Sequence, residues 1–143
     1  MNRIEKTAEL HQNKGMTCAQ SILTVFGPAV GLDAEQAKVL GRPLCGINIG
    51  KYGVCGYISA AAILLGLARN QGNEASARKD TAAAVELLCQ RFKARHGHLR
   101  CKHLVGADMA TPQGRKAVTE QNLIARHCYG YGREVAALLE ELI

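Results

Sequence analysis

Four of the six cysteines in this chain lie where a helix is predicted to begin or to meet a turn. They are Cys18, Cys55, Cys101 and Cys128. Cysteine thiolates bind metal ions and act as nucleophiles, whereas disulfides are typical of secreted proteins. The chain starts with charged residues that no apolar run follows, which is not the pattern of a secretory signal. We therefore expect a cytoplasmic protein whose cysteines bind a metal or carry out redox chemistry.

Two of these cysteines lie at predicted amino ends of helices. Cys18 follows the helix cap expected at Thr17, and Cys55 follows Gly53 and Val54. The free N–H groups and the dipole at such an end stabilise the negative charge of a thiolate. We therefore expect lowered thiol pKa values at both cysteines.

The other two cysteines have basic or glycine-rich surroundings. Cys101 lies between the cations Arg100 and Lys102, which also favour a thiolate. Cys128 lies at a helix-to-turn junction, where two following glycines leave room for a bulky partner. Because all four settings suit a reactive or ligating thiolate, we predict that the four sulfurs converge on one site.

The accessory candidates are Cys45, in a glycine-rich segment, and His103 and His127, which flank two of the cysteines. Cys89 is expected only to fill space, because it lies on an apolar helix stripe. The chain has no CxxC motif, which disfavours zinc ribbons and thioredoxin-like sites. It has no CxxCH motif either, which excludes covalently attached c-type haem.

Helical periodicity extends over most of the chain, and no alternating strand pattern is present. The predicted helices cover residues 4–13, 18–26, 34–40 (capped by Asp33), 55–70, 74–94, 114–127 and 134–143, with a short segment at 99–105 and a hinge at 129–132. Residues 41–53 are rich in glycine, and the helix after them is apolar nearly all round. The sequence therefore predicts an all-α fold: a single compact multi-helix bundle over residues 1–143, with a Gly-rich loop before a buried central helix.

The net charge of +6 includes a basic cluster between Arg91 and His103. Neither an aromatic platform nor a nucleic-acid motif accompanies this cluster, so nucleic-acid binding is disfavoured. The longest apolar stretch, residues 58–68, is shorter than the ~20 residues that cross a bilayer, so no membrane span is expected. The expected partner is a redox partner that the sequence does not identify, and a homo-oligomer is also compatible with the sequence.

Several short motifs follow one another along the chain: Cys18-Ala19-Gln20-Ser21, Gly31-Leu32-Asp33, Gly46-Ile47-Asn48-Ile49-Gly50, Gly53-Val54-Cys55-Gly56 and Leu64-Leu65-Gly66-Leu67. After them come Arg91-Phe92, Gly97, Cys101 and a late Cys128. In this order and spacing, the chain from Cys18 onward resembles the C-GCAxxG-C-C family of redox-active proteins. The resemblance implies an all-helical domain whose family cysteines fall on Cys18, Cys55, Cys101 and Cys128. A similar domain occurs in split-Soret cytochromes, beside haem-binding segments, and is associated there with an iron–sulfur centre.

The chain departs from the family pattern around its glycine-rich loop. Tyr57 and Ala60 stand where the family has a small Ala and a Gly, Ile47 and Asn48 replace loop glycines, and Cys45 is additional. Because tyrosine is bulky, we expect the cavity beside Cys55 to be smaller or reshaped.

Three functions remain open. The first is a small redox protein that holds an iron–sulfur cluster, most simply [2Fe–2S], on Cys18, Cys55, Cys101 and Cys128, since four thiolates are the usual ligands. The second is a metal-free thiol–disulfide oxidoreductase, in which Cys55 attacks and Cys45 or Cys18 resolves the mixed disulfide. The third is a structural or interaction protein with a cysteine-bound zinc or no cofactor. Both an electron carrier and an enzyme fit this pattern.

Overall fold

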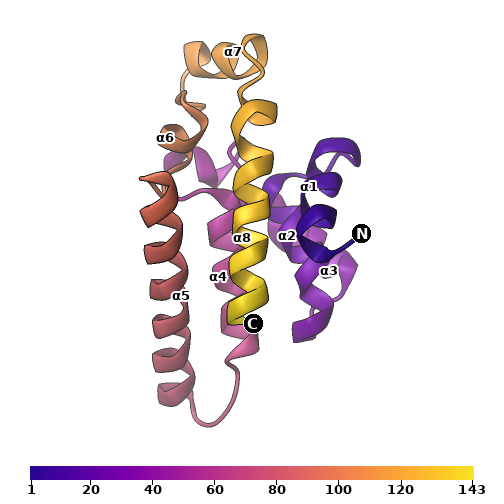
Figure 1. Ribbon diagram of the computed structural model, residues 1–143, viewed down its shortest axis with the longest axis vertical. Coiled ribbons are helices and arrows are strands. Elements are labelled where there is room, and N and C mark those ends of the chain that lie inside the picture. Colours follow the sequence, from indigo (N-terminus) through magenta and orange to yellow (C-terminus); the bar gives the residue numbers. More distant parts are fainter.

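The computed structural model describes all 143 residues, and the all-α prediction is confirmed (Figure 1). The helices are α1 (Arg3–Asn13), α2 (Cys18–Phe26), α3 (Ala34–Gly41), α4 (Gly56–Ala68), α5 (Glu74–His96), α6 (Cys101–Val105), α7 (Pro112–Glu120) and α8 (Tyr129–Leu142). Short 3₁₀ turns are η1 (Gly27–Val30), η2 (Arg42–Leu44) and η3 (Ile49–Tyr52), and η4 (Ile124–Cys128) is a π-helical turn. The β structure consists of a single antiparallel bridge between Val54 and Arg100.

The central helix of the bundle is α4, as the sequence predicts. It packs against α2, α5 and α8, and Figure 1 shows it behind α8, between α5 and the helices near the amino terminus. Its buried side chains lie on one broad face of the helix: Tyr57, Ile58, Ala60, Ala61, Leu64 and Leu65. The residues opposite them, Ser59, Ala62, Ile63 and Gly66, are half-buried. It is only 13 residues long, and none of the helices combines the length and apolar character needed to cross a membrane.

Polar side chains fix where the helices begin. Thr17 and Gln20 form a reciprocal capping box at the amino end of α2. The Asp33 carboxylate accepts the Gln36 N–H at the beginning of α3. Both predicted caps are therefore confirmed. The Thr17 cap makes Cys18 the first residue of α2.

Two predictions about the carboxyl-terminal third are wrong. The helix expected over residues 114–127 is divided after α7, where Asn122 takes a left-handed conformation with a φ of 53°. The hinge expected at residues 129–132 is the first turn of α8. Gly132 serves packing and not bending, because a Cβ atom there would lie 2.7 Å from the hydroxyl of Tyr57.

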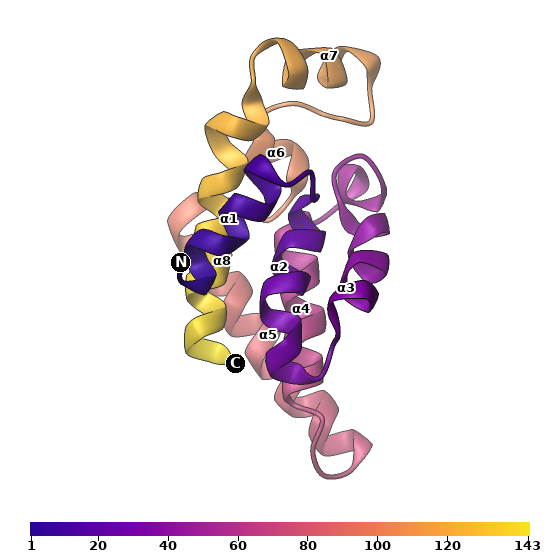
Figure 2. The same ribbon diagram turned by 90° about the vertical axis from the view of Figure 1, so that its right-hand side faces the viewer.

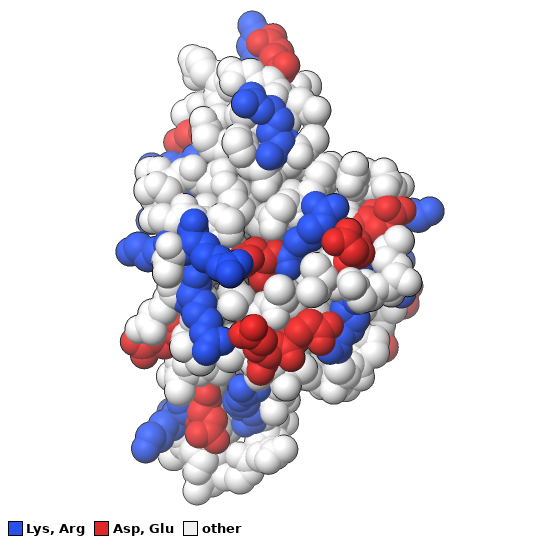
Figure 3. All heavy atoms as spheres, in the orientation of Figure 1, with Lys and Arg blue, Asp and Glu red and all other residues white.

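Ion pairs tie α8 to its neighbours on the face that Figure 3 displays. Cations and carboxylates are intermingled there, and the pairs are Arg3–Glu140, Arg133–Glu5, Arg91–Glu141 and Arg95–Glu134. Exposed pairs of this kind contribute little to stability, on the order of 0–1 kcal/mol each. Their effect is to balance the charge of this face within the chain.

We predict that Thr17→Ala destabilises the protein by about 1 kcal/mol, because the amino end of α2 loses its capping hydrogen bond. Thr17→Ser keeps a hydroxyl at the cap and should cost much less. Urea denaturation followed by circular dichroism measures both. An equal loss in the two variants would mean that the methyl group, and not the cap, stabilises this position.

Candidate functional site

Five cysteines line one cavity of about 230 Å³: Cys18, Cys45, Cys55, Cys101 and Cys128. They come from the amino ends of α2 and α6, the residue before α4, the loop after α3 and the π turn before α8. Most of the remaining wall is apolar, with Met16, Ile47, Leu104, Val105, Met109 and Ile124 among its residues. The fold thus gathers cysteines that are far apart in the sequence around one apolar hollow.

The bridge between two loop segments places Cys55 beside Cys101. The Cys55 N–H donates to the carbonyl of Leu99 at 2.9 Å, and the Cys101 N–H donates to the carbonyl of Gly53 at 3.0 Å. These reciprocal bonds align the beginnings of α4 and α6. Both cysteines are buried, with 8% and 7% of their surfaces exposed.

Cys18 reaches the cavity because α2 approaches the beginning of α4 very closely. A Cβ atom on Gly56 would lie 2.5 Å from the Cys18 sulfur. A larger residue after Cys55 would therefore displace the Cys18 sulfur from its position in the cavity. The glycine that follows the central cysteine thus has a steric role that its position in the motif does not by itself reveal.

Cys128 is the last residue of the π-helical turn Ile124–Cys128, which runs directly into α8. Single π turns are found frequently at functional sites, because the extra residue changes which side chains share a face. No residue pattern in the sequence indicated this turn.

Cys45 adds a fifth thiol that is 5% exposed. Its sulfur lies 3.7 Å from the side-chain nitrogen of Asn48 and 3.8 Å from the carbonyl of Arg42. The other accessory candidates, His103 and His127, do not line the cavity. Cys89 lies on α5, outside the cavity and against the hydrophobic core.

His11, which is not among the residues predicted from the sequence, lines the cavity from α1. Its Nδ1 atom lies 2.5 Å from the hydroxyl of Tyr57, and its ring stands edge-on to the ring of Tyr129. Burial lowers the pKa of His11 to about 4, so the ring is neutral near pH 7. One signal could have found it: Ile4, Ala8 and His11 share one face of the first helix.

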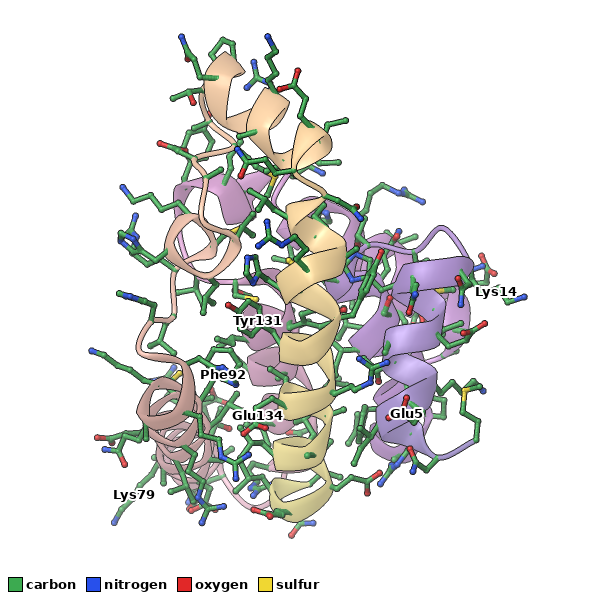
Figure 4. The ribbon with its side chains drawn as sticks, turned by 45° about the horizontal axis from the view of Figure 1, so that its top comes forward. Glu5, Lys14, Lys79, Phe92, Tyr131 and Glu134 are labelled. Atoms are coloured by element: carbon green, nitrogen blue, oxygen red, sulfur yellow. The ribbon has the colours of Figure 1, made fainter.

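Tyr131, which is also absent from the predicted residues, closes the cavity from α8. Its hydroxyl donates to the carbonyl of Leu104 at 2.8 Å, which ties α8 to α6. Figure 4 shows Tyr131 pointing away from α8 into the molecule, close to Phe92 of α5. The sequence predicted a hinge here, and this hid the inward direction of the ring.

Burial governs the ionisation of the cavity thiols. It raises the pKa of Cys101 to about 12 and the pKa of Cys128 to about 12, and the nearby Cys55 thiol adds to both shifts. Both thiols are therefore protonated near neutral pH.

The predicted lowering of pKa at helix amino ends is wrong. Burial raises the pKa of Cys18 well above its ordinary value, and it also raises the pKa of Cys55. The expected N–H groups are present, since those of Tyr57 and Ile58 act on the Cys55 sulfur and oppose the shift. Desolvation is the larger effect, because these thiols face an apolar wall.

The cavity does not have the geometry of a single-ion site. No three Cys, His, Asp or Glu side chains are arranged to hold one metal ion. A tetrahedral zinc site needs its sulfurs about 2.3 Å from one common point. Thiols that surround a hollow leave room for a larger group, and cysteine is the residue type that holds iron–sulfur clusters in proteins.

The chain belongs to the family described as "Putative redox-active protein (C_GCAxxG_C_C)", whose model matches residues 16–142. It is thus a cysteine-containing, all-α member of a redox-active family. The match includes all five cysteines of the cavity, whereas His11 precedes it. No curated protein and no solved structure was found to match the chain.

We predict that the free energy of unfolding of the reduced, chelator-treated protein falls as the pH rises from 9.0 to about 12. In the folded chain Cys101 and Cys128 keep their protons up to about 12, but unfolding returns them to an ordinary value of 9.0. The folded state therefore binds more protons in this window, so the stability present below it is lost as the pH rises. Urea titrations at successive pH values measure the slope.

The double variant Cys101→Ala with Cys128→Ala is the control, because its lysines and tyrosines still titrate. Its slope should be shallower than that of the wild type. Identical slopes would contradict raised thiol pKa values as the cause.

Proposed function

We propose that this protein is a small cytoplasmic redox protein that binds an iron–sulfur cluster, most simply [2Fe–2S], in the cysteine cavity. Cys18, Cys55, Cys101 and Cys128 are the proposed ligands. The observation that carries the proposal is the gathering of these distant cysteines around one apolar hollow. Membership of a redox-active family supports it, and six free cysteines suit a reducing compartment.

When bound, the cluster would supply one-electron transfer at a potential set by its surroundings. The chain contributes backbone N–H groups of Tyr57 and Ile58 at the Cys55 sulfur, which favour negative charge there. The apolar wall limits contact between the sulfurs and water, since Cys55 and Cys101 are buried and Cys18 and Cys128 are half-buried. Because the raised pKa values keep Cys101 and Cys128 protonated, ligation would release protons to solvent.

Cys45 favours a second candidate, a thiol–disulfide oxidoreductase. In this reaction the Cys55 thiolate attacks a substrate disulfide, forms a mixed disulfide and releases one substrate thiolate. Cys45 or Cys18 then attacks the Cys55 sulfur, releases the second substrate thiol and leaves a disulfide with Cys55. The substrate gains two electrons, and the two cysteines lose them. The raised pKa of Cys55 makes this candidate weaker than the cluster, because the attacking species is the thiolate. A protein with a mononuclear zinc site is the least supported candidate, since no three cysteine, histidine or carboxylate side chains are arranged to hold one ion.

We predict that Cys55→Ala abolishes iron and acid-labile sulfide binding, whereas Cys89→Ala retains both. Cys55 lies before α4 at the cavity, and Cys89 lies on α5 outside it. Loss of the small Cys89 side chain should cost only packing, on the order of 1 kcal/mol. The measurement is iron and sulfide content after anaerobic purification, with an absorption spectrum of each variant.

The two candidates predict different results for Cys45→Ala. A cluster on the four family cysteines survives this change, whereas disulfide reduction in which Cys45 resolves the mixed disulfide does not. A colourless wild type without iron or sulfide, even after anaerobic reconstitution, would overturn the cluster proposal.

A further inference from the structure

Exposed apolar side chains are concentrated in one short segment. Six of the eight large hydrophobic residues that are exposed lie between positions 39 and 54: Val39, Leu40, Ile47, Ile49, Tyr52 and Val54. We call the surface that they form, together with the polar residues between them, the 39–54 surface. Exposed apolar residues that cluster in this way mark interaction sites more often than isolated ones do.

The charge of this surface is positive. A groove of about 530 Å³ is lined by Arg42 and Lys51 together with Val39, Pro43, Asn48, Ile49 and Tyr52. Arg100 joins it by donating to the carbonyl of Tyr52 at 2.9 Å. No Asp or Glu occurs from residue 36 to residue 73. Glu35 borders the surface beside Leu40 and is paired with Lys38 at 3.8 Å.

The 39–54 surface is also the outer side of the cysteine cavity. Cys45, Gly46 and Ile47 line the cavity, and Ile47 is 73% exposed. Figure 2 shows α3 and the loop after it on the opposite side of the molecule from α8. A molecule that docks on this loop would therefore lie next to the cysteines.

We propose that the 39–54 surface docks an acidic redox partner protein, with partner carboxylates around Arg42, Lys51 and Arg100 and an apolar contact at Ile49 and Tyr52. This inference rests on the proposed redox function. Transient electron-transfer complexes use small interfaces, below roughly 1,200 Å², and opposite charges speed and orient the encounter. A basic rim around a few exposed apolar residues has these properties.

A second copy of this chain and an anionic membrane both match the 39–54 surface less well than an acidic protein does. A second copy of the chain on a two-fold axis would bring the same cations face to face, which costs free energy. An anionic membrane is usually met by one apolar face of an amphipathic helix. Here only Val39 and Leu40 lie on a helix, and the other four apolar residues come from the loop after α3 with its 3₁₀ turns.

The test measures binding of the anaerobically purified full chain to an acidic plant-type ferredoxin by isothermal titration calorimetry, at low salt and at high salt. We expect salt-sensitive binding that Arg42→Glu with Lys51→Glu weakens by roughly tenfold or more. The neutral pair Arg42→Gln with Lys51→Gln should weaken it less, and Ile49→Ser should weaken it without changing the salt dependence.

The matched control is Lys6→Glu on α1 with Lys79→Glu on α5. It changes the net charge of the protein by the same amount as Arg42→Glu with Lys51→Glu. Both lysines are exposed, and Figure 4 shows Lys79 on α5, remote from the helices near the amino terminus. Equal weakening by the control pair would reveal general attraction and overturn the proposal. Absence of ferredoxin binding would also overturn it, as would binding only to phosphatidylserine vesicles. Iron and sulfide are assayed in the same samples, so a failed cluster proposal and a failed docking proposal give separate results.

Discussion

The α4 helix must be covered over most of its surface, because its residues are apolar nearly all round. Fully burying one large aliphatic side chain contributes about 1.5–3 kcal/mol, so α2, α5 and α8 all gain by packing against it. These three helices cover the sides of α4, and the hollow lies at its amino end. Cys55 precedes that end. The helices α2 and α8 bring Cys18 and Cys128 to it, the bridge between Val54 and Arg100 brings Cys101, and the loop after α3 brings Cys45.

Two opposing effects act on the thiols at this end, and their magnitudes decide the outcome. A helix amino end stabilises a nearby negative charge by about 0.3–1 kcal/mol. Full burial can shift a pKa by up to 3–5 units, and each unit corresponds to about 1.4 kcal/mol. The effect of burial is therefore the larger one, and the pKa of Cys55 rises despite the N–H groups of α4. A bound metal cation would reverse this balance, because it compensates the charge that the apolar wall does not.

Features set by local sequence were predictable, and features set by long-range packing were not. The Thr17 cap and the apolar character of α4 depend on neighbouring residues, and both were found from the sequence. The left-handed Asn122, the π turn before α8 and the hydrogen bond between His11 and Tyr57 depend on how distant helices fit together. The four family cysteines were found as a set, but only packing reveals that Cys45 shares their cavity.

The positive charge of the chain is distributed unequally between two faces. On the α8 face, arginines of three helices are paired with glutamates of the same chain, so that little charge is left for a partner (Figure 3). Residues 36–73 hold four cations and no carboxylate, and they include the whole glycine-rich loop. That loop contributes Cys45 to the cavity and presents Arg42 and Lys51 outside it. One short segment thus forms part of the cavity wall and most of the 39–54 surface. Docking of a partner and binding or oxidation at the cysteines would therefore act on the same backbone. Coupling of this kind is reciprocal, so each event changes the free energy of the other.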